Sequence, residues 1–358
     1  MAYTTIDDPS EYFQTLLYTG DASSSLALTF SGNSNLQPDL IWNKARSFTG
    51  FHVITDTNRG LTKNLYPNDA SGEETYTDRI LSIQSDGFTI GDDTDTMNKD
   101  SQTFANWCWK ANGGTTTTND ASSTSVGTID SVYQADTTAG FSIVTFTGTG
   151  SAGTIAHGLG STPQVIITKD RGVVENFVMH HHTLGATFIM RMDDKVAKVD
   201  AASYNDTLPA STVFSVSDGG SNNQSGNTYV SYCFAEKQGY SKFGSYTGNG
   251  NANGPFIYTG FSPSWVMIKN ATASFGSDNS WIITDSTRNP SNKVDNFLYA
   301  NTSRAEGDAD FVDMDFLSNG FKLRANEYAN NYSGDTMIYM AFAESPFVSS
   351  KGVPTTAV

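Results

Sequence analysis

The stretch PDLIWNK at residues 38–44 recurs in altered form as PQVIITK at 163–169 and PSWVMIK at 263–269. Each copy begins with proline, continues through an apolar run and ends with lysine. The copies begin 125 and 100 residues apart. Because short apolar runs between turn residues are typical of buried strands, the pattern predicts one β-structured unit that is present three times.

Two further landmarks follow each copy in the same order. A phenylalanine pattern reads DGFTI (86–90), VFSV (213–216) and GFKL (320–323), and an aromatic stretch reads WCWKA (107–111), YCFAE (232–236) and MAFAE (340–344). Three landmarks repeated three times in one order are improbable by chance. We therefore interpret the chain as an internal triplication.

The composition favours strands over helices. Charged residues make up 16% of the 358 residues, against about 25% in typical globular domains. Few charges with abundant Thr, Tyr and Phe disfavour long amphipathic helices, and glycine-rich turn signals close the strand patterns at 141–150 and 240–250. We predict an all-β fold of three tandem β-sandwich repeats, of jelly-roll or lectin-like type, with an N-terminal arm.

The landmarks also set the expected boundaries. The predicted divisions are an N-terminal arm at 1–22, repeats at 23–114, 140–239 and 240–348, a linker or edge-hugging extended segment at 115–139, and a tail at 349–358. The arm carries apolar residues that no upstream repeat covers. We therefore expect part of it to pack against the first repeat or against a neighbouring subunit.

Charge and cysteine content narrow the function classes. The net charge is −16 and no basic stripe is present, which argues against nucleic-acid binding. No 18-residue apolar run or signal-peptide pattern occurs, so no membrane insertion is expected. Two cysteines are too few for a disulfide framework or a thiolate metal site. The expected setting is a reducing cytoplasm, or assembly there into something larger.

Two potential ion pairs occupy equivalent places in the first and third repeats. They are Asp56 with Arg59 and Asp285 with Arg288, whereas the second repeat has His181 and Leu184 there. Joint loss of both partners is what a structural ion pair predicts, because one buried charge left alone costs several kcal/mol. An anion-binding arginine is the alternative.

The histidine cluster His180, His181 and His182 is a possible metal site. Consecutive strand residues point to alternate faces, so the three rings cannot all bind one ion. Two of them would need carboxylates from elsewhere, such as Asp193 and Asp194. We favour a solvated or partly packed strand, and we predict no metal site.

A second possible metal site is the acidic group Asp92, Asp93 and Asp95 near Asn98. The spacing lacks the glycine at loop position six and the closing glutamate of an EF-hand. A solvated acidic hairpin tip is the favoured interpretation. His157, in the sequence HGLG, is expected in a turn with its ring bonded to the backbone.

No constellation for nucleophilic catalysis or phosphate binding is present, since G-x-S-x-G and P-loop patterns are missing. Cys108 and Cys233 lie between aromatic residues and are replaced by Ala341 in the third repeat, which indicates core residues. Glu236 and Glu344 recur, but nothing fixes a second acid beside either. We predict no catalytic residue, no cofactor and no enzymatic activity.

Tryptophans could line shallow carbohydrate-binding faces, because aromatic rings stack on sugars as they anchor interfaces. Trp42 and Trp265 lie inside the proline–lysine stretches, however, and Trp281 follows the third of these. We therefore favour core packing for them. Phe88, Phe214 and Phe321 precede the aromatics of the next landmark by 20 or 21 residues, and we expect each to pack beside that aromatic in one repeat core.

Several stretches resemble a family of phage virion proteins, common in marine phage genomes, that is built from tandem β-domains. The matching stretches are YTTIDDPS at 3–10, YFQ at 12–14, AGFSIVTFTGTG at 139–150, HGLG at 157–160 and FAEKQGYSKFGSYTGNG at 234–250. The resemblance covers nearly the whole chain and carries over no catalytic residue. It implies a structural or tail-fibre-like component of the virion.

The expected function is therefore that of a non-enzymatic phage virion structural protein, of tail-fibre or spike type, that presents β-domains for host-surface attachment. The alternative is a capsid decoration, cement or capsid-fibre protein, and a carbohydrate-active enzyme is a third. Expected partners are other virion proteins, further copies of the chain in a homo-oligomer (most simply a trimer), and a host-surface glycan.

Overall fold

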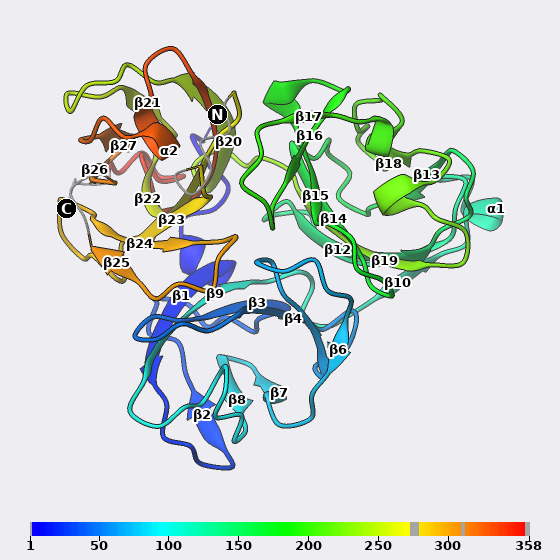
Figure 1. Ribbon diagram of the computed structural model, residues 1–358, viewed down its shortest axis with the longest axis horizontal. Helices are drawn as coiled ribbons and strands as arrows, with labels where there is room; N and C mark the ends of the chain where they lie inside the picture. Colours follow the sequence, from blue (N-terminus) through cyan, green and yellow to red (C-terminus); the bar gives the residue numbers. More distant parts are fainter. Residues whose placement is uncertain (1, 273–278, 309–311, 355–358) are drawn as a thin grey trace.

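A computed structural model describes residues 2–272, 279–308 and 312–354 and shows an almost entirely β-structured chain, with 41% of residues in strands and 6% in helices. The all-β prediction is confirmed. Three lobes surround a common centre, as Figure 1 shows in blue to cyan, green, and yellow to red. We call them the first lobe (13–109), the second lobe (117–234) and the third lobe (241–346).

The first lobe contains a six-stranded sheet in the order β1-β9-β3-β4-β5-β6 and a three-stranded sheet in the order β2-β8-β7. A 3-10 helix (Pro9–Glu11) precedes it. Its strands are β1 (Phe13–Thr19), β2 (Leu26–Leu28), β3 (Leu40–Ala45), β4 (His52–Asp56), β5 (Lys63–Leu65), β6 (Glu74–Thr75), β7 (Ile80–Gln84), β8 (Gly87–Ile90) and β9 (Thr103–Trp109).

The second lobe contains an eight-stranded sheet, β10-β11-β12-β19-β14-β15-β16-β17, and the pair β13-β18. Its elements are β10 (Thr117–Asn119), α1 (Ala121–Thr124), β11 (Ser131–Asp136), β12 (Phe141–Thr147), β13 (Gly153–Ala156), β14 (Val165–Asp170), β15 (Val178–His181), β16 (Phe188–Arg191), β17 (Val199–Asp200), β18 (Val213–Val216) and β19 (Thr228–Phe234), with 3-10 turns at His182–Leu184, Ala202–Tyr204 and Gly220–Asn222.

The third lobe contains a six-stranded sheet, β20-β28-β22-β23-β24-β25, and a three-stranded sheet, β21-β27-β26. Its elements are β20 (Ser241–Thr247), β21 (Phe256–Tyr258), β22 (Phe261–Asn270), β23 (Ile282–Asp285), β24 (Asn296–Tyr299), β25 (Gly307–Asp308), β26 (Met314–Leu317), β27 (Gly320–Leu323), α2 (Tyr328–Asn331) and β28 (Thr336–Pro346). None of the helices in the described residues has the length and apolarity needed to cross a membrane.

The three large sheets share a strand order at their centres. The aromatic-landmark strands β9, β19 and β28 each lie between the first long strand of the lobe and the proline–lysine strand, which is β3, β14 or β22. Every residue of β3, β14 and β22 is buried. Both faces of these strands are covered, and this explains why their sequences are continuous apolar runs rather than alternating ones.

One face of each large sheet packs against the small sheet of its own lobe. Three separate clusters of buried side chains result, and they contain Phe88, Phe214 and Phe321 respectively. The opposite faces of the three large sheets meet at the centre of the molecule, where one cluster takes side chains from all three lobes. Each lobe thus has a core of its own and a share in a common core.

The common core is organised around Trp109, Phe234 and Phe342. Their ring centroids lie 6.3 Å (Trp109–Phe234), 5.5 Å (Trp109–Phe342) and 5.9 Å (Phe234–Phe342) apart. The expectation that Phe88, Phe214 and Phe321 pack beside these aromatics in one repeat core is wrong, because the three phenylalanines lie in the separate lobe cores and not in the common core. Strand β8 pairs with β2 and β7 rather than β9, and alternation along β9 turns Cys108 toward the lobe core and Trp109 toward the common core.

The predicted N-terminal arm is corrected by the sheet pairing. Residues 13–19 form β1, which pairs along its whole length with β9, so this part of the arm is a strand of the first sheet. The residues before it reach the third lobe, where the Tyr3 hydroxyl donates to the Gly260 carbonyl (2.8 Å), and the segment that precedes this lobe, where the Thr4 hydroxyl donates to the Gln238 carbonyl (2.7 Å). The start of the chain therefore connects the first and third lobes.

The segment 115–139 is an edge of the second sheet and not a free linker. Strand β11 pairs with β12 over six residues, and β10 pairs with β11. Of the two interpretations drawn from the sequence, the extended edge segment is the one that the structure shows. Residues 355–358 of the predicted tail lie outside the described residues.

Candidate functional site

The lysines that end the three proline–lysine stretches are fully buried where the lobes meet. Each ammonium donates to a main-chain carbonyl of another lobe, from Lys44 Nζ to Ser303 (3.4 Å), from Lys169 Nζ to Ala70 (3.1 Å) and from Lys269 Nζ to Lys195 (3.0 Å). The contacts run in one direction, from the first lobe to the third, from the second to the first and from the third to the second. They close a ring.

Burial lowers the pKa of Lys44 and Lys269 to about 7, and it also lowers that of Lys169. The sequence showed these lysines recurring but gave no reason for them. The one signal in the sequence was a lysine at the end of an apolar run. The sequence does not show that this position is buried, because the burial depends on the close approach of a second lobe.

Stability is expected to rise from about pH 7 toward the ordinary lysine value of 10.5. In that interval the unfolded chain still binds protons that the folded Lys44 and Lys269 have released, so raising the pH favours the folded state. Below about pH 7 both states are protonated and this contribution is at its minimum. Thermal unfolding of the wild type and of Lys269→Met at about pH 7, 8 and 9 measures this contribution as the slope of stability against pH. The slope should be shallower in the variant, and equal slopes would contradict the assignment.

A buried ion network connects the first lobe to the second. Arg59 Nε lies 2.5 Å from Asp56 Oδ2, Arg59 Nη1 lies 3.0 Å from Glu73 Oε2, and Arg171 Nε lies 2.8 Å from the same Glu73 oxygen. The Tyr232 hydroxyl of the second lobe donates to Asp56 Oδ2 at 2.8 Å. The ion pair predicted from the sequence is therefore present, and it lies in an interface between lobes.

The same arrangement connects the third lobe to the first. Arg288 Nε lies 2.6 Å from Asp285 Oδ2, Arg288 Nη1 lies 2.9 Å from Glu306 Oε1, and Arg46 Nη2 lies 2.7 Å from Glu306 Oε2. The Trp107 indole donates to Asp285 Oδ2 at 3.0 Å. Arg59 and Arg288 each donate to the buried carboxylate of the aspartate three residues earlier. Both arginine side chains are fully buried, so an external anion cannot reach either guanidinium.

The junction of the second and third lobes does not contain the buried aspartate–arginine pair that the other two junctions have, within the described residues. His181 takes the place of the aspartate, its Nε2 lies 3.2 Å from the Tyr339 carbonyl, and burial lowers its pKa to about 3. The Lys198 amide donates to the Ala271 carbonyl at 3.1 Å. The same main-chain hydrogen bond joins the glutamate to the arginine of the neighbouring lobe at the other two junctions, so Lys198 and Ala271 occupy the places of that glutamate and arginine. Within the described ranges, no arginine–carboxylate pair joins these two lobes, and the ion pair of Lys242 with Glu236 links β20 to the segment that follows β19.

The other histidines divide between core and turn. His180 and His181 are fully buried, so the prediction of a solvated or partly packed strand is wrong for both. His182 is exposed and its Nε2 lies 2.9 Å from the Phe243 carbonyl. The prediction for His157 is confirmed, since backbone groups lie 3.2 and 3.3 Å from its ring nitrogens. No group of three or more potential metal ligands occurs in the described part of the chain.

The acidic group near residue 93 is only partly a solvated tip. Asp92 and Asp95 are exposed, but Asp93 is buried and its Oδ2 lies 2.6 Å from Arg79 Nε. Asn98 is also fully buried and donates to main-chain carbonyls. The solvated interpretation is therefore wrong for Asp93 and Asn98, whose side chains hold the loop in place.

The predictions of core positions for cysteine and tryptophan are confirmed. Cys108 and Cys233 are buried and free, and burial raises the pKa of both thiols. Trp42, Trp265 and Trp281 are also buried, so none of the three forms an exposed platform for a sugar.

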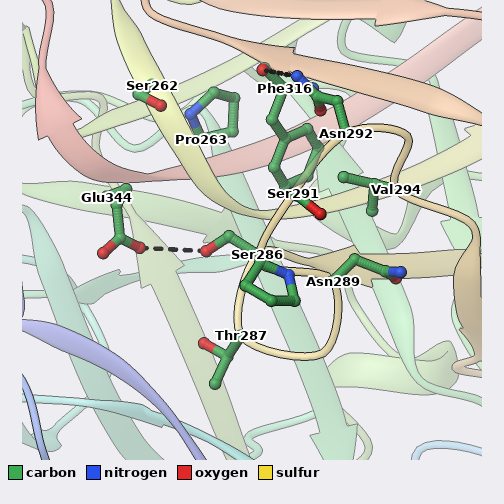
Figure 2. A pocket seen from close by; sticks show the side chains of 11 residues that line it. Ser262, Pro263, Ser286, Thr287, Asn289, Ser291, Asn292, Val294, Phe316 and Glu344 are labelled. Carbon is green, nitrogen blue, oxygen red and sulfur yellow. Dashed lines mark hydrogen bonds between the residues drawn. The ribbon is translucent and has the colours of Figure 1, made fainter. Parts of the chain in front are cut away.

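A pocket of about 280 Å³ opens on the third lobe and is shown in Figure 2. Its lining residues are Ser262, Pro263, Ser286, Thr287, Asn289, Pro290, Ser291, Asn292, Val294, Phe316 and Glu344. The Ser286 hydroxyl donates to Glu344 Oε2 at 3.1 Å, as Figure 2 shows. Glu344 is the one carboxylate in this lining, whereas glycoside hydrolysis by an acid pair needs two.

A pocket of about 290 Å³ on the first lobe was missed by the sequence reasoning. It is lined by Phe51, Tyr66, Asp69, Ser71, Glu74, Tyr76, Arg79, Asp95 and Thr96. These residues come from strand β6 and from four separate connections between β3 and β9, and no motif joins them in the sequence. Aromatic and carboxylate side chains together suit polar ligands that also have an apolar face.

Residues 8–346 match the family model described as Domain of unknown function (DUF7483), and the chain belongs to that family. A search of curated proteins found no match.

Proposed function

We propose that this chain is a non-enzymatic structural protein of a phage virion, of tail-fibre or spike type, that presents β-lobes to the host surface. The resemblance of residues 139–150 and 234–250 to tandem-β virion proteins supports the assignment. We also infer that the three lobes are tandem β-sandwich repeats. Their shared strand order and their separate two-sheet cores support this inference.

The observation that carries the proposal is the closed ring of lobes. Each of the three junctions uses a buried lysine that donates to the neighbouring lobe, and one aromatic core takes side chains from all three. A rigid body with three similar faces suits a structural position in an assembly, because symmetric assemblies repeat one contact around an axis. The contacts described here stabilise the body itself and leave its outer loops available to partners.

A capsid decoration, cement or capsid-fibre protein is the second candidate. It is favoured by the same ring, since a three-lobed body matches the local threefold positions of an icosahedral shell. Both candidates place the chain in the virion and in contact with other virion proteins. They differ in whether its position is at the tail or on the capsid.

Electron microscopy of virions labelled with an antibody against this chain tests the proposal and separates the candidates. Label at fibre or spike tips supports host attachment, and label distributed over the shell supports decoration. Washed virions that contain none of the chain would overturn both.

The proposed oligomer is a homotrimer, and sedimentation equilibrium tests it. A trimer has three times the chain mass of 38.6 kDa. A mass of one chain at micromolar concentration would show instead that the ring of three lobes already supplies the threefold arrangement within one molecule.

A further inference from the structure

We propose that the first-lobe pocket binds a pyranose unit that offers hydroxyl or ammonium donors and carries no carboxylate. The inference rests on the proposed function, which supplies a host-surface glycan as the partner, and it adds the site and the class of sugar. The pocket has a volume of about 290 Å³ and is lined by β6 and by connections that lie between β3 and β9.

An exposed aromatic ring forms one wall of the pocket. Phe51 is 45% exposed although it is a large apolar residue, and its ring centroid lies 5.5 Å from that of Tyr66. An exposed phenylalanine inside a concave site offers an apolar face to the C–H face of a sugar ring. The third-lobe pocket of Figure 2 differs here, because its aromatic residue, Phe316, is buried.

A carboxylate is held in position beside this ring. Glu74 is exposed, and its Oε2 accepts hydrogen bonds from the hydroxyls of Tyr66 (2.7 Å) and Tyr76 (2.9 Å). These two donors fix the carboxylate, while no described residue donates to its other oxygen, Oε1. A fixed acceptor loses little conformational entropy when a hydroxyl or ammonium group of the ligand binds to it.

The base of the pocket is rigid and electrically balanced. The Arg79 guanidinium lies 3.5 Å from the ring centroid of Tyr76, and Arg79 Nε lies 2.6 Å from Asp93 Oδ2. Its positive charge is therefore neutralised within the protein. The Arg79 Nη1 atom also donates to the Tyr66 hydroxyl at 3.1 Å, which holds that phenol toward Glu74.

The charges that remain at the rim are negative. Asp69, Glu74 and Asp95 line the pocket, and within the described residues none of them forms an ion pair. Their combined field attracts hydroxyl and ammonium donors and repels a carboxylate on the ligand. The site is thereby expected to reject uronic and sialic acids.

A glycan array that contains neutral, amino-bearing and carboxylate-bearing oligosaccharides, probed with the labelled full-length chain, provides the first test. Binding to neutral or amino-bearing members and not to acidic ones is expected. Calorimetry with the best-bound oligosaccharide then compares variants. Phe51→Ala should weaken binding about tenfold. Glu74→Gln should also weaken binding.

Two matched controls make the test specific. Phe256→Ala removes a phenylalanine on the third lobe that is also 45% exposed, and Glu344→Gln removes the carboxylate of the Figure 2 pocket. Neither should change the affinity. Preference for acidic glycans, no binding to neutral or amino-bearing members, or equal losses in Phe51→Ala and Phe256→Ala would each overturn the inference. Detection of the chain in virions is a separate result, so this site can fail while the proposed function stands.

Discussion

Replacing Phe342 with alanine is expected to destabilise all three lobes together, by about 3–5 kcal/mol. The ring centroid of Phe342 lies 5.5 Å from that of Trp109 in the first lobe, 5.9 Å from that of Phe234 in the second and 5.3 Å from that of Phe13. Truncation leaves a cavity where the lobes meet, and each lobe loses packing there. Calorimetric scans should show one shared unfolding transition that moves to lower temperature.

Phe214→Ala provides a second test of the coupling, since Phe214 is equally buried but lies in the core of the second lobe alone. If the common core couples the lobes, this variant also lowers a single shared transition rather than splitting it. Lobes that unfold independently would instead show one transition moved and the others unchanged. That outcome with Phe342→Ala would contradict the coupling.

Arg288→Met is expected to cost about 3–5 kcal/mol, because it leaves Asp285 buried without its guanidinium partner. The Arg288 and Asp285 side chains are both fully buried, and Arg288 also pairs with Glu306 across the network that joins the third lobe to the first. Trp107 would remain the one donor to Asp285 Oδ2 from the neighbouring lobe. Chemical denaturation measures the loss in the free energy of unfolding.

Lys242→Met provides the control, since it breaks the ion pair with Glu236 in which both side chains are partly exposed. Such pairs contribute less than about 1 kcal/mol. The double variant Asp285→Asn with Arg288→Met should recover part of the loss, because it removes the uncompensated charge. A loss in Arg288→Met no larger than in Lys242→Met would refute the structural role of the network.

The sequence was sufficient to predict residue roles wherever a repeated position restricted the side chain. Cys108 aligned with Cys233 and with an alanine, and both cysteines are core residues. The second repeat lacks the counterparts of both Asp56 and Arg59, and these two residues form an ion pair in the first lobe. In each case comparison between copies within one chain distinguished packing from chemistry.

Other features could not be predicted because they depend on which lobe approaches which. Lys44 is a buried lysine only because the third lobe covers it, and nothing near it in the sequence shows that. The pocket beside Phe51 joins loops that are far apart along the chain. His180 was expected to be solvated or partly packed, since a strand pattern does not reveal how many layers cover it.

The sequence by itself determined the β-class of the chain, its landmark strands and the pairing of charges within the first and third repeats, because these depend on local pattern and on neighbours a few residues away. Only the tertiary structure decided that β1 belongs to the first sheet and that the start of the chain reaches the third lobe. It also decided that the three large sheets turn one face each to a common core. The physical reason is that alternating side chains give a strand two apolar faces, and the sequence cannot show which surface covers each of them.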